Sequence, residues 1–329
     1  MERQGRLLEK IAEMENLQLA FYKAKKGKAS KREVLKYGKH FQENLLNLRQ
    51  QILSCRVIPG NYRYFTIYDP KKRLICAAPF GQRVLHHALM NVCHLFFEKV
   101  QIFDSYASRP GKGTYAALER AKQFNCHYKW FLKLDYNKYF DSLDHIILKK
   151  QLNSIFKDRD LLIIFYKIID SYRAKPNQGV PIGNLTSQYF SNHYLAIADH
   201  YVKETLKIKA YVRYMDDMVL WHNDKKTLIK AGLKLDKFSA CQLKLTLKPF
   251  CLNQNLKGLP FLGYLLYPDK IRLAHRSCGR FIKKYNMYEK NLKSGKWTEK
   301  EYQIHILPLI AFTKHANAKE FRKKMIANN

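Results

Sequence analysis

Three aspartates stand at the ends of apolar segments. Asp216 and Asp217 interrupt the apolar run YVRYMDDMVL, and Asp135 directly follows the segment WFLKL. Such flanks predict strands, so the pair is expected at the tip of a hairpin and Asp135 at a strand end. Three carboxylates at strand ends can hold two divalent cations about 3.5–4 Å apart, which suits transfer of a phosphate group. Two aspartates are also ordinary in a turn, so the surrounding pattern has to favour catalysis.

The charge of the chain supplies part of that context. Its 329 residues contain 60 Lys and Arg against 27 Asp and Glu, a formal net charge of +33. A folded protein with this much self-repulsion usually has a polyanionic partner, such as nucleic acid. Hydrophobic residues make up 47% of the chain, which excludes a largely disordered protein.

Several other classes of protein are disfavoured. The seven cysteines form no CxxC pair, so neither a disulfide framework nor a zinc knuckle is expected. The N-terminus is charged and amphipathic, unlike a signal peptide, and no apolar run approaches the length of a membrane span. We therefore expect a cytoplasmic protein with no membrane partner.

The elements that must position the aspartates are mixed in type. Apolar residues at helical spacing predict helices, and alternating apolar residues predict strands. The predicted helices span 7–21, 33–54, 83–100, 161–172 and 185–203, and the last sixty residues also read as basic helices. The predicted strands span 62–67, 74–78, 130–134, 210–221 (with a turn), 243–247 and 259–267, with a turn at Asp69–Lys72 between the first two. This mixture predicts the α+β class.

The motifs resemble those of a known family. Tyr-Met-Asp-Asp at 214–217 resembles the signature of reverse transcriptases, and LKLDYNKYFDSLDH at 132–145 resembles their first catalytic block. The resemblance implies a right-hand polymerase fold and makes Asp135, Asp216 and Asp217 the catalytic metal ligands, with Asp217 having the smaller share. It places Tyr136 beside both the metal and the nucleotide. Two Mg²⁺ ions are expected, and Mn²⁺ can substitute for them.

The resemblance also implies a nucleotide site. Phe140 falls where these enzymes place an aromatic gate that excludes a 2′-hydroxyl, although an isolated phenylalanine would be assigned to the core. The segment 69–89 resembles the fingers block, where Arg73 and Arg83 are expected to hold the triphosphate because a guanidinium fits phosphate oxygens.

Other segments are expected to hold template and primer. The segment 103–121 resembles the next family block, with Arg109 and Lys112 against the template backbone. FLGYLLYP at 261–268 resembles the primer grip and contains Gly263, and Lys283 and Lys284 lie in the basic thumb. The implied domains are an N-terminal helical extension (1–60), fingers (61–125), a palm with finger–palm insertions (126–268) and a short thumb (269–329).

One block points to a subgroup. The segment GVPIGNLTSQYFSN at 179–192 resembles the block that packs against the nascent base pair, which most reverse transcriptases write as QGxxxSP. Here Ile182 precedes the glycine, and Gln188 stands where proline is usual. This variant resembles the reverse transcriptases of diversity-generating retroelements. These enzymes copy a template RNA into cDNA from dNTPs, with errors at adenines, for mutagenic retrohoming. Their accessory variability determinant protein, expected as a pentamer, is the implied partner.

Alternatives from the same and from another class stay open. The chain could be a group II intron, retron or phage-defence reverse transcriptase. We expect no maturase or endonuclease extension, which disfavours the first, and no VTG tripeptide lies near the thumb, which disfavours the second. It could also be a non-catalytic RNA-binding relative of a polymerase, although Asp135, Asp216, Asp217 and Phe140 are all intact.

Overall fold

The computed structural model describes residues 6–68 and 72–327. Most of the turn predicted at Asp69–Lys72 therefore lies outside the described residues. The chain forms two compact units, each assembled from separate segments. The first contains residues 1–103, 136–205 and 234–248, and the second contains residues 104–135, 206–233 and 249–329.

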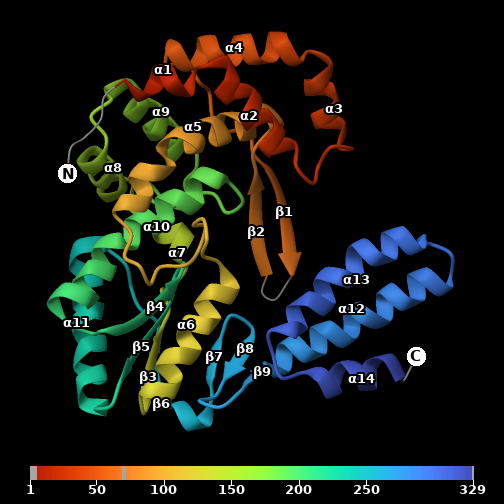
Figure 1. Ribbon diagram of the computed structural model, residues 1–329. Coiled ribbons are helices and arrows are strands. Elements are labelled where there is room, and N and C mark those ends of the chain that lie inside the picture. The colour runs from red at the N-terminus through yellow and green to blue at the C-terminus, as the bar shows by residue number, and fades with distance from the viewer. Residues whose placement is uncertain (1–5, 69–71, 328–329) are drawn as a thin grey trace. The chain divides into compact units, whose positions relative to one another are not determined.

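The first unit begins with four helices that pack on a long fifth one (Figure 1). They are α1 (Leu7–Ile11), α2 (Met14–Lys25), α3 (Arg32–Lys39), α4 (Phe41–Leu53) and α5 (Phe80–Lys99). The single helices predicted over 7–21 and 33–54 are thus each divided in two. At the start of α1, the carboxylate of Asp158 accepts hydrogen bonds from the backbone N–H groups of Leu7 and Leu8 at 2.7 and 3.0 Å and so caps the helix.

The same unit contains a hairpin and a second group of helices. Strands β1 (Arg63–Tyr68) and β2 (Lys72–Ala77) pair antiparallel, close to the predicted ranges. The helices are α7 (Tyr139–Ser142), α8 (His145–Ile155), α9 (Arg159–Asp170) and α10 (Leu185–His200), followed by a π-helical turn, η1 (Tyr201–Thr205). Asp144 caps α8 by accepting from the N–H groups of Ile146 and Ile147. Most of α10 is buried, including polar residues such as Ser191 and Asp199.

A four-stranded antiparallel sheet forms the centre of the second unit. Its strands are β3 (Trp130–Leu134), β4 (Ala210–Tyr214), β5 (Asp217–His222) and β6 (Cys251–Gln254), in the order β4-β5-β3-β6. Helix α6 (Thr114–His127) packs on it through the core of Leu118, Phe131 and Trp221. The indole N–H of Trp221 donates to Asn125 at 2.9 Å, which satisfies the one polar atom of this buried ring. The predicted strands 130–134 and 210–221 are confirmed.

Two other predicted strands need correction. Residues 259–267 form a hairpin of β7 (Leu259–Phe261) and β8 (Tyr264–Leu266), because Leu262 and Gly263 both have positive φ, as a tight two-residue turn requires. Residues 243–247 form no strand. Instead, α11 (Lys225–Leu243) extends into the range, and Leu247 makes only an isolated bridge with Tyr136.

The C-terminal part of the second unit is helical, as predicted. After β9 (Ile271–Leu273) come α12 (His275–Lys293), α13 (Glu299–Lys314) and α14 (Lys319–Ala327), and α12 and α13 lie side by side (Figure 1). Phe281, Tyr285 and Ile306 form a small core of their own. The chain is therefore α+β, as expected. Within the described residues, no helix is both long and apolar enough to cross a membrane.

Candidate active site

Strand register brings the three aspartates to one end of the sheet. Tyr214 pairs with Asp217, which leaves Met215 and Asp216 as a two-residue turn, and Met215 takes a left-handed φ of 55°. On the other side of β5, Leu134 pairs with Met218. Asp135 follows β3 and Asp217 begins β5, so the two residues lie at the same end of the sheet.

The carboxyl groups of Asp135 and Asp216 are close enough to share a proton. Burial, then the charge of Asp135 and a hydrogen bond to its carboxyl group, raise the pKa of Asp216 to about 6, and Asp217 adds to the rise. Two carboxylates in such contact repel each other when both are ionised. The site therefore concentrates negative charge that a bound cation would neutralise.

Asp217 has a cationic neighbour within the sheet. The ammonium group of Lys133, on β3, lies 3.1 Å from the carboxylate of Asp217 and donates to the backbone oxygen of Pro260 at 2.8 Å. It therefore connects the hairpin of the aspartate pair to β7. Sequence reasoning overlooked Lys133, although a lysine inside the apolar strand WFLKL was a visible signal.

The donor set fits a divalent cation. Carboxylate oxygens are the preferred ligands of Mg²⁺ and Mn²⁺, and Asp135 and Asp216 are the residues that would hold the ion. Across residues 6–68 and 72–327, no group of three His, Cys, Asp or Glu side chains is gathered as a complete metal site. Of the three predicted ligands, Asp135 and Asp216 therefore contact each other, and Asp217 forms an ion pair with Lys133.

A buried arginine stabilises the turn of Met215 and Asp216 by a hydrogen bond. Arg213 is fully buried in β4 and donates from Nη1 to the backbone oxygen of Met215 at 3.0 Å. Its own backbone is held by Asp104 and Tyr106, at 3.0 Å each. Sequence reasoning missed Arg213 as well. Its signal was a charged residue between two apolar ones in a strand, a place where a cation is retained only with partners.

The first unit holds the residues predicted to select the nucleotide. Phe140 is partly exposed and lies edge-on to Tyr139, and its backbone oxygen accepts from the N–H of Val180 at 2.9 Å. Two residues on, the oxygen of Ile182 accepts from the N–H of Cys76, on β2, at 2.8 Å. The loop 177–183 therefore joins the predicted sugar gate to the hairpin that carries Arg73.

The remaining nucleotide candidates differ in their surroundings. Tyr136 is fully buried, and its hydroxyl group hydrogen-bonds that of Ser239 at 2.8 Å. Arg73 is exposed on β2, whereas Arg83, on α5, makes an ion pair of 2.5 Å with Glu33. Gln188 lies partly buried in the first turn of α10.

The template and primer candidates belong to the second unit. Arg109 donates to the backbone oxygen of Ser105 at 2.6 Å, so it also stiffens its own loop. Lys112 lies over the ring of Tyr106. The oxygen of Gly263 accepts from the hydroxyl group of Ser277 on α12 at 2.7 Å. On the same helix, Lys283 is exposed and Lys284 is partly buried.

Comparison with known proteins places these features in a family. A family model described as reverse transcriptase (RNA-dependent DNA polymerase) matches residues 68–265. The putative COX1/OXI3 intron 2 protein of Saccharomyces cerevisiae is 23% identical over 151 residues, which cover 44% of this chain and 16% of the yeast protein. The group II intron-encoded protein LtrA of Lactococcus lactis is 26% identical over 177 residues, which cover 51% of this chain and 29% of LtrA. The chain thus spans less than a third of either relative.

A solved structure agrees on the fold. Telomerase from Candida albicans, in complex with a fragment of telomeric RNA, superposes with a TM-score of 0.52 at 12% identity and covers 71% of this chain and 51% of that chain. At this identity the likeness concerns architecture alone, and it confirms the predicted right-hand polymerase fold. With the family match extending across both catalytic blocks, the chain belongs to the reverse transcriptase family.

Proposed function

We propose that the protein is an RNA-directed DNA polymerase that extends a DNA primer on an RNA template with dNTPs. The contact between the carboxyl groups of Asp135 and Asp216 at the strand ends is the observation that carries this proposal. In the reaction the primer 3′-oxygen bonds to the α-phosphorus, the bond from that phosphorus to pyrophosphate breaks, and the hydroxyl proton passes to water. Divalent cations, when bound, supply charge neutralisation and a more acidic hydroxyl group. Asp135 and Asp216 hold them, with Asp217 in the smaller role.

The nucleotide site consists of residues from the first unit. Arg73 and Arg83 bind the triphosphate, with Arg83 exchanging its ion pair with Glu33 for phosphate oxygens. The ring of Phe140 lies under the sugar and excludes a 2′-hydroxyl. Ile182 and Gln188 shape the pocket of the nascent pair. Tyr136 contributes through its backbone, since its hydroxyl group is already bonded to Ser239.

Template and primer bind along the basic residues of the second unit. Arg109 and Lys112 contact the template backbone, Gly263 lies under the primer, and Lys283 and Lys284 contact the duplex. Residues 1–60 form the N-terminal extension, 61–125 the fingers, 126–268 the palm and 269–329 the thumb. The family description supports an RNA template, and the charge of +33 supports contacts with phosphates.

At the finer level, we propose the reverse transcriptase of a diversity-generating retroelement. It copies a template RNA into cDNA with errors at adenines, with Mg²⁺ and together with a pentameric accessory variability determinant protein. The support is the run IGNLTSQ, in which Ile182 and Gln188 depart from the common QGxxxSP. An amide side chain in place of proline adds hydrogen-bonding freedom beside the nascent pair and so loosens selection.

The test is primer extension by purified protein on a mixed-sequence RNA with magnesium, with and without the accessory protein, followed by sequencing of the cDNA. Errors concentrated opposite adenine support both levels of the proposal. Accurate cDNA removes the retroelement assignment and keeps the polymerase. Asp135→Asn and Asp216→Asn should abolish synthesis but retain RNA binding. If neither the wild type nor these variants make DNA while all bind RNA, the protein is a binding relative.

Gln188→Pro tests the source of the errors. Gln188 is the fourth residue of α10, so proline there removes at most the first backbone hydrogen bond of the helix and leaves the later ones in place. We expect fewer errors opposite adenine and unchanged errors opposite the other bases, measured by sequencing the same cDNA. Thr186→Pro is the matched control in the same turn. Equal error spectra for Gln188→Pro and wild type would place the source of the errors elsewhere.

A group II intron-type reverse transcriptase is the second candidate. It is favoured by the similarity to LtrA, whose name identifies it as a group II intron-encoded protein. An enzyme of this type should copy RNA with errors spread evenly over the four bases and without any need for the accessory protein. The sequencing experiment therefore separates the two candidates.

A further inference from the structure

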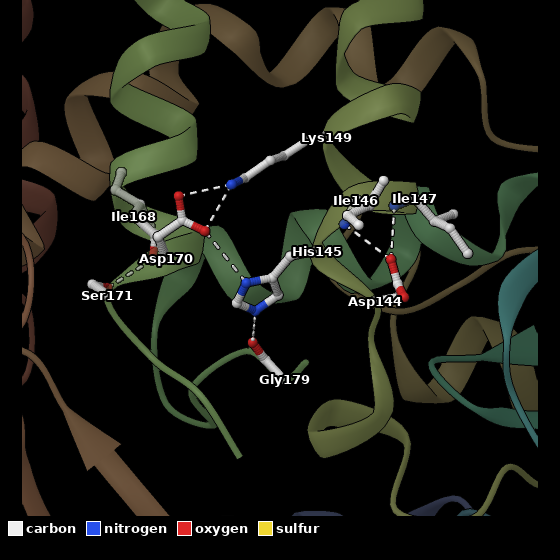
Figure 2. Close-up of polar contacts among 9 residues, drawn as sticks. All are labelled: Asp144, His145, Ile146, Ile147, Lys149, Ile168, Asp170, Ser171 and Gly179. Carbon is white, nitrogen blue, oxygen red and sulfur yellow. Dashed lines mark hydrogen bonds and ion pairs between the residues drawn. The ribbon is translucent and has the colours of Figure 1, made fainter. Parts of the chain in front are cut away.

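A buried histidine at the start of α8 lies between a carboxylate and the loop 177–183 (Figure 2). The Nε2 atom of His145 lies 2.7 Å from the backbone oxygen of Gly179, and its Nδ1 atom lies 3.4 Å from the carboxylate of Asp170. Lys149 approaches the same carboxylate at 2.7 Å. The side chain of His145 is only 2% exposed.

The chemistry of these contacts fixes the ring. A backbone carbonyl oxygen can only accept, so Nε2 of His145 must carry the hydrogen. The carboxylate of Asp170 lies 3.4 Å from Nδ1, which makes no hydrogen bond within the described residues, and Asp170 is itself held by Lys149, one turn further along α8. The hydrogen bond of the imidazole is therefore the one that Nε2 donates to the carbonyl group of Gly179.

That carbonyl group belongs to a segment whose backbone is bound on both sides. The N–H of Gly179 donates to Leu143 at 2.8 Å, and the N–H of Val180 donates to Phe140 at 2.9 Å. At its far end, Ile182 accepts from Cys76 on β2 at 2.8 Å. A shift of the Gly179 carbonyl group would therefore also displace the backbone of Phe140 and Ile182.

The turn has no room to absorb such a shift. Gly179 has a φ of +102°, and a Cβ atom built there would come within 3.0 Å of the backbone nitrogen and Cβ of Ala174. The backbone of His145 also binds the loop, since its N–H donates to the backbone oxygen of Asn177 at 2.9 Å. Displacements as small as about 1 Å are enough to lower catalytic rates on the order of a hundredfold when they move groups that orient a substrate.

We propose that His145, through its hydrogen bond to Gly179, is a positioning residue of the nucleotide site. It holds the loop 177–183 so that Phe140 faces the sugar and Ile182 faces the nascent pair. This inference rests on the roles proposed above for Phe140 and Ile182. The competing explanation is that the cluster only stabilises the fold, and the experiment has to separate the two.

Three substitutions of His145 separate the effect of its Nε2 donor from the effect of the rest of the ring. His145→Gln places an amide nitrogen near the position of Nε2 and retains the donor to Gly179. His145→Asn places one near the position of Nδ1 and loses that donor, and His145→Ala loses both. Leu148→Ala is the control, because Leu148 is fully buried on the same helix and its truncation destabilises α8 without removing a hydrogen bond to the loop.

The measurements are kcat and KM for dNTP and the preference for dNTP over rNTP in primer extension, with unfolding free energies determined in parallel. We expect His145→Asn and His145→Ala to raise the KM for dNTP on the order of tenfold or more and to weaken sugar selection. His145→Gln should stay near the wild type, and Leu148→Ala should lose stability but keep its sugar selection.

Two results overturn the inference. One is that His145→Ala and Leu148→Ala behave alike at equal stability, and the other is that His145→Gln is as defective as His145→Asn. If His145→Ala does not fold, the comparison of Gln with Asn decides. Phe140→Ala is measured beside them. Should it leave sugar selection unchanged, the gate assignment fails independently, and His145 is then judged on the KM for dNTP alone.

Discussion

At the scale of single residues, the site is built from groups that oppose folding. Asp216 is largely buried beside Asp135, and its pKa is raised to about 6 because ionising it costs both hydration and repulsion. Arg213 is a fully buried cation that supports the turn. Such groups persist in proteins when function needs them, since burial of charge is unfavourable unless it is compensated.

Asp216→Asn should therefore stabilise the metal-free protein while it abolishes synthesis. A carboxyl group whose folded pKa lies above its unfolded value of 3.8 lowers stability increasingly from about pH 4 to pH 6, and fully above pH 6. Removing the charge should raise the free energy of unfolding by about 1–3 kcal/mol at pH 7.5. Urea unfolding in the presence of a chelator measures this change.

Asp269→Asn is the matched control for that measurement. Asp269 is exposed and pairs with Lys270, so its substitution should leave the free energy of unfolding nearly unchanged. If Asp216→Asn were destabilising under the same conditions, the crowding of the carboxyl groups would not be the dominant interaction at this position.

At the scale of elements, the sequence predicted what local pattern determines. Apolar runs predicted β3, β4 and β5, and so the end of the sheet where the aspartates lie, whereas the alternating segment 243–247 forms no strand. The cap of α1 was missed because Asp158, which accepts from the N–H of Leu7, lies 151 residues away along the chain. The pairing of Lys133 with Asp217 and the contact of His145 with Gly179 depend on strand register and loop path, which no local pattern encodes.

Helix α5 contains a histidine that should make the protein acid-labile. His86 is fully buried, and burial, with a smaller contribution from His87, lowers its pKa to about 3. The folded state keeps His86 neutral while the unfolded state binds a proton below pH 6.5, so stability is lost as the pH falls from 6.5 toward 3. His86→Leu should recover about 2 kcal/mol at pH 5 relative to pH 7.5.

Urea unfolding at the two pH values measures this recovery. His40→Gln is the control, because His40 is exposed and should leave the pH dependence nearly unchanged. An identical acid sensitivity of His86→Leu and wild type would assign the loss to other groups, of which buried His193, with a pKa lowered to about 4 by burial, is the next to test.

The hairpin β7–β8 depends on Gly263 for its docking to α12. Gly263 has a φ of +89°, and an added Cβ would lie 3.1 Å from the hydroxyl oxygen of Ser277 and 3.3 Å from the ring of Phe312. Gly263→Ala should lower the free energy of unfolding by about 1–2 kcal/mol through backbone strain and crowding. Gly295→Ala has a similar positive φ with open space around it and separates strain from crowding.

At the scale of the whole molecule, charge dominates. The formal charge of +33 attracts any nucleic acid, and its contribution depends steeply on salt. Sequence composition alone predicted this property, because it needs no knowledge of the fold. It cannot say which lysines face the duplex, since most lysines of the described chain are exposed.

Lys283→Ala should reduce the salt dependence of RNA–DNA binding if Lys283 contacts a phosphate. Each lost phosphate contact should lower the slope of log K against log salt concentration by about 1. Fluorescence anisotropy across a salt series measures the slope. Lys39→Ala, on α3, is the comparison at another exposed site, and equal slopes for the two variants would remove Lys283 from the interface.

The central position of β3 has a consequence for partly damaged protein. This strand is hydrogen-bonded to β5 on one side and β6 on the other, so its backbone amides exchange with solvent only when large parts of the sheet open. The C-terminal helices have a small separate core and can melt earlier. On the roles proposed for Asp135 and for residues 269–329, a gently heated preparation would still bind divalent ions after it has lost the ability to hold a primer, so ion binding alone would be a poor assay of an intact enzyme.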